Sequence, residues 1–284
     1  MRSFASRLKH RIFYRSAPLF YVYERFMHRR YGMGRPGEEI VGPSGKRFPI
    51  AELMRELRDK GICSLPGYYS PEQADALYGE VIAWNEHVKD GRIPADDKGD
   101  LFSGKVVWAK NLHAQGIIRI HNVQKLGERC AVFHRDPNFI RLGGLYTGKP
   151  IININTISQY NEPIPAGCRG YHFDSYLNQF KSFVYLNDVT EENGPHDYRV
   201  GSNAVTRANM RRAYMSIRSE NTSVSDAEAE ATGYPHRTFP GERGTVLLVD
   251  TRGIHQGANL KTGHRLALTG YWYLKEDWPQ FSGD

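Results

Sequence analysis

The sequence predicts an α+β domain whose core is an antiparallel β-sandwich or barrel. Its first half contains segments with helical periodicity, whereas short runs rich in β-branched and aromatic residues begin at about residue 151. Turn-forming sequences, such as Asn193-Gly194-Pro195, separate these runs from one another. Because the helices precede the strands and do not alternate with them, we expect a sheet core with N-terminal helices packed on it.

Local signals predict the helices of the first half. Apolar residues recur with helical spacing at Ile50, Leu53, Met54 and Leu57. This pattern indicates a helix over residues 49–60 that ends at Gly61, followed by a short strand over residues 62–65. Ser70-Pro71-Glu72-Gln73 has the residues of a helix start, with Ser as N-cap, Pro at the first helical position and Gln at the third. A further helix is expected around residues 137–142.

The second half is predicted to be mostly β-structure. Strands are expected over residues 151–160, 168–173, 181–188, 198–200, 245–250 and 265–274. Residues 219–233 are polar and acidic, so they are expected to form a surface excursion or a mobile loop. Most of residues 90–150 contain no pattern from which an order of elements can be assigned.

The basic charge lies at one end of the chain. The whole sequence carries +7, and residues 1–35 contain nine Lys or Arg and one acid, so the other 249 residues carry −1. We therefore divide the chain into a basic, aromatic arm over residues 1–41 and a single catalytic domain over residues 42–284. Two functions of the arm stay open: packing on the body or on a second subunit, or peripheral contact with an anionic membrane.

Composition excludes several classes of protein. A nearly neutral body argues against a nucleic-acid partner, because such proteins concentrate basic residues along their cleft. No run of 18 apolar residues is present, so no membrane span is expected. Cys63, Cys130 and Cys168 are odd in number and widely spaced, which indicates buried thiols in a reducing compartment. The expected location is cytoplasmic, with peripheral membrane contact through the arm as an option.

Three residues are candidate metal ligands. His172 and Asp174 form an H-x-D motif at the end of a predicted strand, where alternation places both side chains on one face. His255 follows the predicted strand over residues 245–250 and can supply a third ligand. Two imidazoles and one carboxylate on one face of Fe(II) leave three positions for a bidentate oxo-acid and O2. These three ligands carry −1, so the site keeps a formal +1 that favours an incoming dianion.

Arg265 is the candidate anchor of that dianion. It lies ten residues after His255 and opens a predicted strand. A buried guanidinium can bind a carboxylate through two parallel hydrogen bonds. Arg265 is therefore expected to bind the far carboxylate of 2-oxoglutarate, and an ion pair with a surface acid is the structural alternative.

Further motifs surround these residues. The central ones are His172-Phe173-Asp174, residues 181–189, Glu192-Asn193-Gly194-Pro195 and Val200-Gly201-Ser202-Asn203; the later ones are residues 244–250, Ile254-His255, Gly257 and Arg265. In this order and spacing they resemble the phytanoyl-CoA dioxygenase-like family, and the likeness extends over roughly residues 50–275. The resemblance implies a double-stranded β-helix (jelly-roll, cupin-like) core, Fe(II), 2-oxoglutarate and O2, and usually hydroxylation.

The resemblance also bears on individual residues. It places Lys181 where family members offer a polar side chain to 2-oxoglutarate. Asp174 favours hydroxylation, because similar enzymes that halogenate have a small residue at this position. Gly257 stands where a Ser often contacts 2-oxoglutarate, so this hydrogen bond is absent or made by another residue. His196 stands after the N-G-P turn where an apolar residue is common; it is not expected to be a metal ligand, because the spacing favours His255.

Other polar residues are weaker candidates for the site. Asn155 and Gln159 are candidate contacts of the co-substrate, and Asn161, Tyr176, Asn178 and Tyr185 are candidate contacts of the substrate. Asn155, Gln159 and Asn161 lie on the strand before the H-x-D motif, so ordinary strand polarity is the alternative for them. Tyr176 and Asn178 follow the motif in a predicted loop.

The sequence thus predicts a 2-oxoglutarate-dependent dioxygenase that oxidises a small polar metabolite or a natural-product intermediate. Two alternatives stay open. One is an acyl-CoA hydroxylase, which would need a basic groove for the nucleotide phosphates. The other is a membrane-binding or partner-binding protein that acts through the arm, and the retention of His172, Asp174, His255 and Arg265 counts against it.

Overall fold

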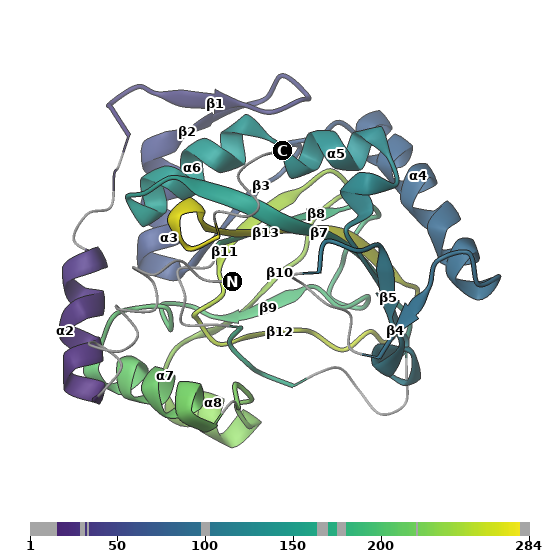
Figure 1. Cartoon of the computed structure of the whole chain (residues 1–284). Coiled ribbons are helices and arrows are strands. Elements are labelled where there is room, and N and C mark those ends of the chain that lie inside the picture. Colours follow the sequence, from purple (N-terminus) through teal and green to yellow (C-terminus); the bar gives the residue numbers. More distant parts are fainter. Residues whose placement is uncertain are drawn as a thin grey trace.

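Two β-sheets face each other, and helices cover the outer face of the larger one (Figure 1). The arrangement is taken from a computed structural model. The structure describes residues 16–28, 32, 34–97, 103–163, 170–174, 180–219 and 221–278.

The elements have the following bounds. The α-helices are α2 (Ala17–His28), α3 (Ile50–Lys60), α4 (Pro71–Lys89), α5 (Glu128–His134), α6 (Pro137–Thr147), α7 (Arg207–Ser219) and α8 (Asp226–Ala231), and the 3-10 helices are η1 (Lys110–Gln115), η2 (Val123–Lys125) and η3 (Lys275–Asp277). The strands are β1 (Glu39–Val41), β2 (Arg47–Pro49), β3 (Ile62–Leu65), β4 (Ala95–Asp96), β5 (Val107–Ala109), β6 (Ile117–His121), β7 (Ile151–Asn161), β8 (Phe180–Tyr185), β9 (His196–Arg199), β10 (His236–Phe239), β11 (Val246–Asp250), β12 (His255–Gly257) and β13 (Arg265–Leu274).

The large sheet has eight strands in the order β3-β11-β8-β13-β7-β6-β5-β4, and the small sheet has three in the order β10-β9-β12. Neighbouring strands are antiparallel in both sheets, except that β4 and β5 are parallel. A separate hairpin joins β1 to β2. The predicted α+β class with a double-stranded β-helix core and N-terminal helices packed on it is confirmed.

The predicted helices of the first half form for the expected local reasons. Helix α3 ends at Gly61, whose φ of 85° is left-handed and whose N–H donates to the Leu57 carbonyl. Helix α4 begins at Ser70 with a complete capping box, in which Ser70 and Gln73 each bond the other's backbone N–H. Both helices bury one apolar face against the large sheet or against neighbouring helices.

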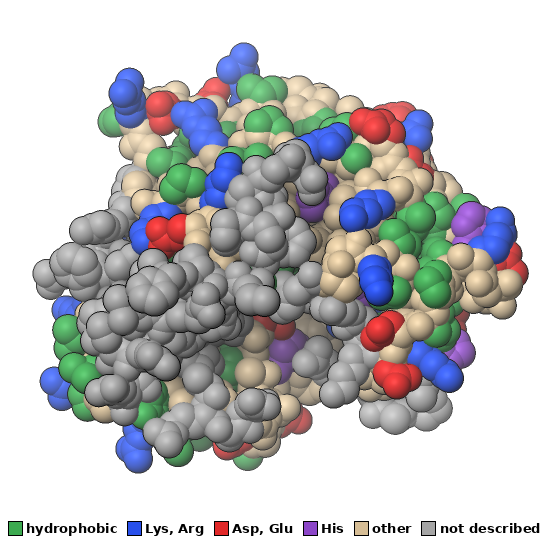
Figure 2. Space-filling model, in the orientation of Figure 1, with side chains coloured by type: hydrophobic (Ala, Val, Ile, Leu, Met, Phe, Trp, Pro, Cys, Tyr) green, Lys and Arg blue, Asp and Glu red, His purple; other side chains and the backbone are tan. Residues whose placement is uncertain are grey.

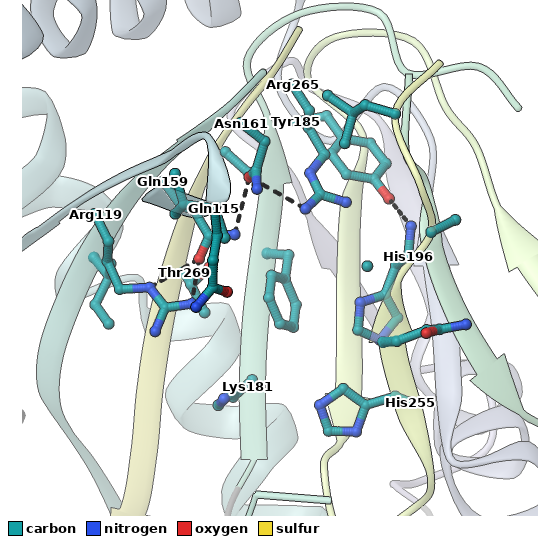
Figure 3. Close-up of a pocket in the computed structure, with 18 of the residues that line it drawn as sticks. Gln115, Arg119, Gln159, Asn161, Lys181, Tyr185, His196, His255, Arg265 and Thr269 are labelled. Carbon is teal, nitrogen blue, oxygen red and sulfur yellow. Dashed lines mark hydrogen bonds between the residues drawn. The ribbon is translucent and has the colours of Figure 1, made fainter. Parts of the chain in front are cut away.

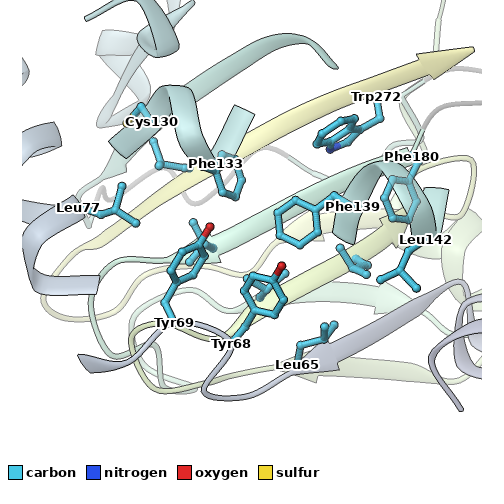
Figure 4. Packing of buried hydrophobic residues seen from close by; sticks show 14 of the residues in the cluster. Leu65, Tyr68, Tyr69, Leu77, Cys130, Phe133, Phe139, Leu142, Phe180 and Trp272 are labelled. Atoms are coloured by element: carbon cyan, nitrogen blue, oxygen red, sulfur yellow. The ribbon is translucent and has the colours of Figure 1, made fainter. Parts of the chain in front are cut away.

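Strand alternation separates the hydrophobic core from the inner face of the large sheet. Phe180 and Val184 of β8 face the helices, where they join the main core cluster with Phe139 and Trp272 (Figure 4). The alternate residues of β8 and β13 face the small sheet instead. Polar side chains of these strands, such as Lys181 and Arg265, line the space between the two sheets.

Several stretches differ from the sequence-based expectation, including α7 and β10, which were not predicted. Residues 90–150 contain β4, β5 and β6, which were not predicted. In the predicted strand over residues 168–173, the described part pairs only through isolated bridges at His172. Residues 219–233 are no mere surface loop: they include α8, and Val224 is buried. Ser225 forms a capping box with Glu228, so the sequence Ser225-Asp226-Ala227-Glu228 did contain a helix signal.

The described part of the arm packs on the body. Phe20 of α2 is fully buried in a cluster with Tyr171, Phe173 and Ile254, and α2 also contacts α7. Over the described part of the surface in Figure 2, basic and acidic side chains are interspersed, in keeping with a nearly neutral body. Within the described residues, no helix combines the length and the apolar character needed to cross a membrane.

Candidate functional site

A cavity lies between the inner face of the large sheet and the small sheet (Figure 3). Strands β7, β8 and β13 contribute one wall, and β9 and β12 contribute the opposite one. The polar residues that line it are Gln115, Arg119, Gln159, Asn161, Glu162, His172, Asp174, Lys181, Tyr185, His196, His255, Gln256, Arg265, Thr269 and Tyr271. The apolar part of the lining includes Ile117, Ile157, Phe183, Leu260 and Ala267.

His172, Asp174 and His255 converge at one end of this cavity. One ligand atom from each lies within 4.8 Å of the others, so the group can hold a metal ion. His172 and His255 are direct partners in an antiparallel bridge, with backbone hydrogen bonds of 2.9 and 2.8 Å. The N–H of Asp174 donates to the Thr251 carbonyl. Backbone pairing thus brings together ligands that are far apart in the sequence.

The two imidazoles are oriented by backbone carbonyls. The Nδ1 atom of His172 lies 3.0 Å from the Gly170 carbonyl oxygen, and that of His255 lies 2.9 Å from the Gly253 carbonyl oxygen. Because a carbonyl only accepts, each Nδ1 carries the proton and each Nε2 presents a lone pair. The Nε2 atoms lie 3.7 and 3.3 Å from the Asp174 carboxylate oxygens. This arrangement suits a divalent metal, whose histidine ligands are commonly held in this way.

The charged surroundings of Asp174 keep its carboxyl group ionised. Burial alone would raise the pKa of its carboxyl, but the positive charge beside it, above all on the Lys181 ammonium, outweighs burial and holds this pKa well below its usual range. The Lys181 Nζ lies 2.5 Å from Asp174 Oδ2 and 4.0 Å from the centre of the Tyr271 ring. Lys181 therefore orients the carboxylate as well as lining the cavity.

Arg265 lies at the other end of the cavity, at the first position of β13. Its guanidinium is buried and donates to the Gly194 carbonyl and, at 3.2 Å, to the Asn161 side-chain oxygen. Gly257 lies against it, since a Cβ atom at residue 257 would be 2.9 Å from Arg265 Nη2. The small residue at position 257 thus leaves room for the guanidinium, which accounts physically for this departure from the family pattern.

The remaining predicted site residues divide into three groups. Gln159, Asn161 and Tyr185 line the cavity. Asn155 is not among the lining residues: its side-chain oxygen accepts from the Asn122 N–H at 2.9 Å, and the residue is fully buried. The Asn155 side chain therefore provides the acceptor for a buried backbone N–H, and it does not line the cavity. Tyr176 and Asn178 lie outside the described residues.

Sequence reasoning missed Arg119 and did not assign His196 a role in the site. Arg119, on β6, directs two guanidinium N–H groups at the Gln159 oxygen, and Gln159 in turn donates to Asn161. The alternating run Ile117-Ile118-Arg119-Ile120-His121 was the available signal for β6. His196 lines the cavity beside His255, with ring centres 5.4 Å apart. Burial, followed by the nearby positive groups, lowers the pKa of His196 well below its usual value.

Asp197 links the two segments that carry the histidine ligands. Its Oδ2 accepts hydrogen bonds from the Tyr171 hydroxyl at 3.0 Å and from the Gln256 amide at 2.8 Å. Tyr171 precedes His172, and Gln256 follows His255. Asp197 itself is buried, and its Oδ1 lies 3.0 Å from His236 Nε2. Asp197 is therefore a positioning residue, which fixes the spacing of the ligand-bearing segments without contacting the ligands.

We expect Asp197→Ala to lower the free energy of unfolding of the metal-free protein by about 1–3 kcal/mol, because the buried Tyr171 hydroxyl and the partly buried Gln256 amide lose their acceptor. Metal affinity should fall as well, and Asp197→Asn, which keeps an acceptor, should lose less of both. Urea unfolding and metal titration measure the two effects. Asp188→Ala removes an exposed carboxylate that bonds Arg243 and serves as the matched control. Equal losses in the two alanine variants would contradict this role.

Comparison with known proteins supports the fold. No protein-family model matches the chain, and no curated protein matches it either. Solved structures, in contrast, do match the chain. The chain is similar to EctD from S. alaskensis with 2-oxoglutarate and 5-hydroxyectoine (14% identity, 87% of each chain covered, TM-score 0.59). It is also similar to SnoK, a non-haem α-ketoglutarate-dependent carbocyclase from nogalamycin biosynthesis (15% identity, 78% of this chain and 83% of that chain, TM-score 0.57). A third is HygX from Streptomyces hygroscopicus with nickel and 2-oxoglutarate bound (16% identity, 78% and 86%, TM-score 0.53).

Proposed function

We propose that this protein is an Fe(II)- and 2-oxoglutarate-dependent dioxygenase that oxidises a small polar metabolite or a natural-product intermediate. The observation that carries the proposal is the set of residues that line one cavity. It has a His-Asp-His group able to hold a metal at one end and a buried arginine at the other. A dicarboxylate with an oxo-acid end can bind both at once. A purely structural or docking role would not require a metal-binding group and a buried arginine in the same cavity.

The donor set fits iron. Two neutral imidazoles and a carboxylate, His172, His255 and Asp174, form the group that binds Fe(II) in oxygenases and leaves positions open on one side. When bound there, Fe(II) with 2-oxoglutarate and O2 would supply the oxidising power, with decarboxylation of 2-oxoglutarate to succinate and CO2. The three ligands carry −1 and Fe(II) carries +2, so the loaded site would keep a formal +1 and attract a dianion.

The protein's own residues would bind and orient the reactants. Arg265 would receive the distal carboxylate of 2-oxoglutarate, with Asn161 and the Gly194 carbonyl holding its guanidinium in place. Lys181 would hold the second oxygen of Asp174 and thereby fix which oxygen faces the metal. The two sheets shield the reaction from bulk water on opposite sides. The retained carboxylate at Asp174 is the feature that favours hydroxylation over halogenation.

The substrate class rests on the cavity and on similar proteins. Arg119, Gln159 and Asn161 form a polar ladder along one wall, with Gln115 and Glu162 near it. Such a wall suits a polar molecule with several hydrogen-bonding groups. Among the similar structures, SnoK belongs to nogalamycin biosynthesis and EctD contains 5-hydroxyectoine. An acyl-CoA substrate is less favoured, because the body has a net charge of −1 and offers no excess of basic residues for the nucleotide phosphates.

The test is 2-oxoglutarate turnover. Purified protein should bind one Fe(II), and succinate should form from 2-oxoglutarate in the presence of O2. A panel of sugars, amino acids and natural-product intermediates should contain compounds that raise this turnover and gain oxygen. Replacing Fe(II) by Zn(II) is the matched control, because zinc occupies the same ligands without redox chemistry. Protein that binds no metal and forms no succinate with any compound would contradict the proposal.

For the arm we propose a role as a structural brace, with contact to a membrane or a second subunit as the alternative. Helix α2 supports this, because Phe20 packs beside residues that flank His172 and His255. A truncated protein that begins at Gly37 should therefore unfold at lower urea concentration than the full chain. Full-length protein should not sediment with vesicles of anionic lipid. Salt-sensitive sedimentation together with unchanged stability of the truncated protein would favour the membrane role instead.

A further inference from the structure

His196 lies in the wall of the cavity. Within the described part of the chain, no hydrogen-bond partner is found for its buried Nε2 atom. The residue is 7% exposed, and its Nε2 atom is enclosed without a hydrogen-bond partner. Its contacts are ring contacts, with Phe183, Tyr198 and His255. A buried polar group normally finds a partner, because leaving it unsatisfied costs free energy. The position of His196 therefore calls for an explanation by function.

The position of His196 on β9 relates it to the anchor arginine. His196 is the direct cross-strand partner of Gly257 on β12. Gly257 has no side chain and lies against the Arg265 guanidinium. In Figure 3 the His196 ring lies between Arg265 and His255, on the wall that connects the two ends of the cavity. A dicarboxylate that extends from the metal end to Arg265 would therefore pass along this ring.

The ring of His196 is held firmly. Its backbone N–H donates to the Tyr185 hydroxyl oxygen at 3.0 Å, and that hydroxyl donates in turn to the Phe239 carbonyl. Phe183 lies on one side with ring centres 5.1 Å apart, and His255 lies at 5.4 Å with an interplanar angle of 25°. A residue fixed in this way can act as a preorganised donor, which loses little conformational freedom when it binds a ligand.

We propose that His196 is a second anchor of the co-substrate, whose Nδ1–H, on the ring nitrogen that is not enclosed, donates a hydrogen bond to the distal carboxylate beside Arg265. This inference rests on the proposed function. An imidazole carries an N–H in its neutral and in its charged form, so the contact does not depend on protonation. It would supply the polar contact that Gly257 cannot make.

The experiment compares two oxo-acids on metal-loaded protein. Isothermal titration calorimetry under anaerobic conditions, with Mn(II) in the site, measures the affinity for 2-oxoglutarate and for 2-oxobutanoate. The second compound has the same metal-binding end but lacks the distal carboxylate. His196→Phe keeps an aromatic ring and removes both nitrogens. We expect it to weaken 2-oxoglutarate binding roughly tenfold to a hundredfold, as for loss of a hydrogen bond to a charged group. Binding of 2-oxobutanoate and of Mn(II) should stay unchanged.

Two further variants keep the test decisive if His196→Phe folds poorly. His196→Asn and His196→Gln place an amide nitrogen near the positions of Nδ1 and Nε2, so one of them should recover part of the affinity for 2-oxoglutarate. His87→Phe, on α4 and away from the cavity lining, is the matched control and should bind like the unmodified protein.

The other possible outcomes would contradict either the second anchor or the proposed function. Unchanged 2-oxoglutarate affinity in His196→Phe would overturn the second anchor. A loss shared equally by 2-oxobutanoate would also overturn it, since the ring would then act on the metal-binding end. A loss of Mn(II) affinity would show that His196 acts on the metal site, either as a ligand or through its ring contact with His255, and would contradict the proposal. Failure of the unmodified, metal-loaded protein to bind 2-oxoglutarate at all would instead overturn the proposed function itself.

Discussion

We expect His255→Ala to remove the metal from the protein and to abolish succinate formation. The reason is the geometry of the ligand group, in which the Nε2 atoms of His172 and His255 flank the Asp174 carboxylate. Loss of a residue that only supports a ligand lowers metal affinity about 10–100-fold, so loss of a ligand itself should exceed about 100-fold. Asp174→Ala should have the same effect, and Lys181 would then lose its buried partner as well.

Metal content after dialysis against a weak chelator measures this loss, and 2-oxoglutarate consumption measures the activity. The unfolding free energy of the metal-free variants should be recorded too, because His255 is buried. His264→Ala, which removes a partly buried imidazole that bonds Tyr78 outside the site, is the matched control. Full iron content and activity in His255→Ala would show that the assignment of the three ligands is wrong.

The second large effect is expected at Arg265. If this guanidinium binds the distal carboxylate of 2-oxoglutarate, Arg265→Ala leaves a buried carboxylate without its charged partner. Such a loss costs about 3–5 kcal/mol, or roughly a hundredfold to several-thousandfold in affinity. Arg265→Lys should recover little, because an ammonium cannot form the planar pair of hydrogen bonds that a guanidinium forms.

Calorimetric titration of metal-loaded protein with 2-oxoglutarate measures this effect separately from turnover. Metal affinity should be unchanged, because Arg265 is not among the converging ligand atoms. Arg243→Ala is the matched control: this arginine pairs with Asp75 and Asp188 on the surface. If Arg265→Ala bound 2-oxoglutarate as tightly as the unmodified protein, another cation in the cavity, such as Lys181 or Arg119, would have to be the anchor.

Elements governed by local rules were predictable from the sequence. Helices α3 and α4 follow from apolar spacing, a left-handed Gly61 and a Ser70 capping box, all of which are contained in a few consecutive residues. Strands β8 and β13 follow, in the same local way, from runs rich in β-branched and aromatic residues bounded by turn signals. Strand β4 has two residues and β5 has three. Their pairing depends on distant neighbours, so no local pattern was long enough to reveal them.

For the site, the sequence determined the kinds of residue and their order: an H-x-D motif, a later histidine and an arginine at the start of a strand. Only the tertiary structure decided which of them meet. The His172–His255 bridge sets the metal geometry, and the β9–β12 register places His196 opposite Gly257. Strand alternation gave the face on which Asn155 lies but not its hydrogen-bond partner, the Asn122 N–H. Partners across a sheet are set by long-range pairing, which no short stretch of sequence encodes.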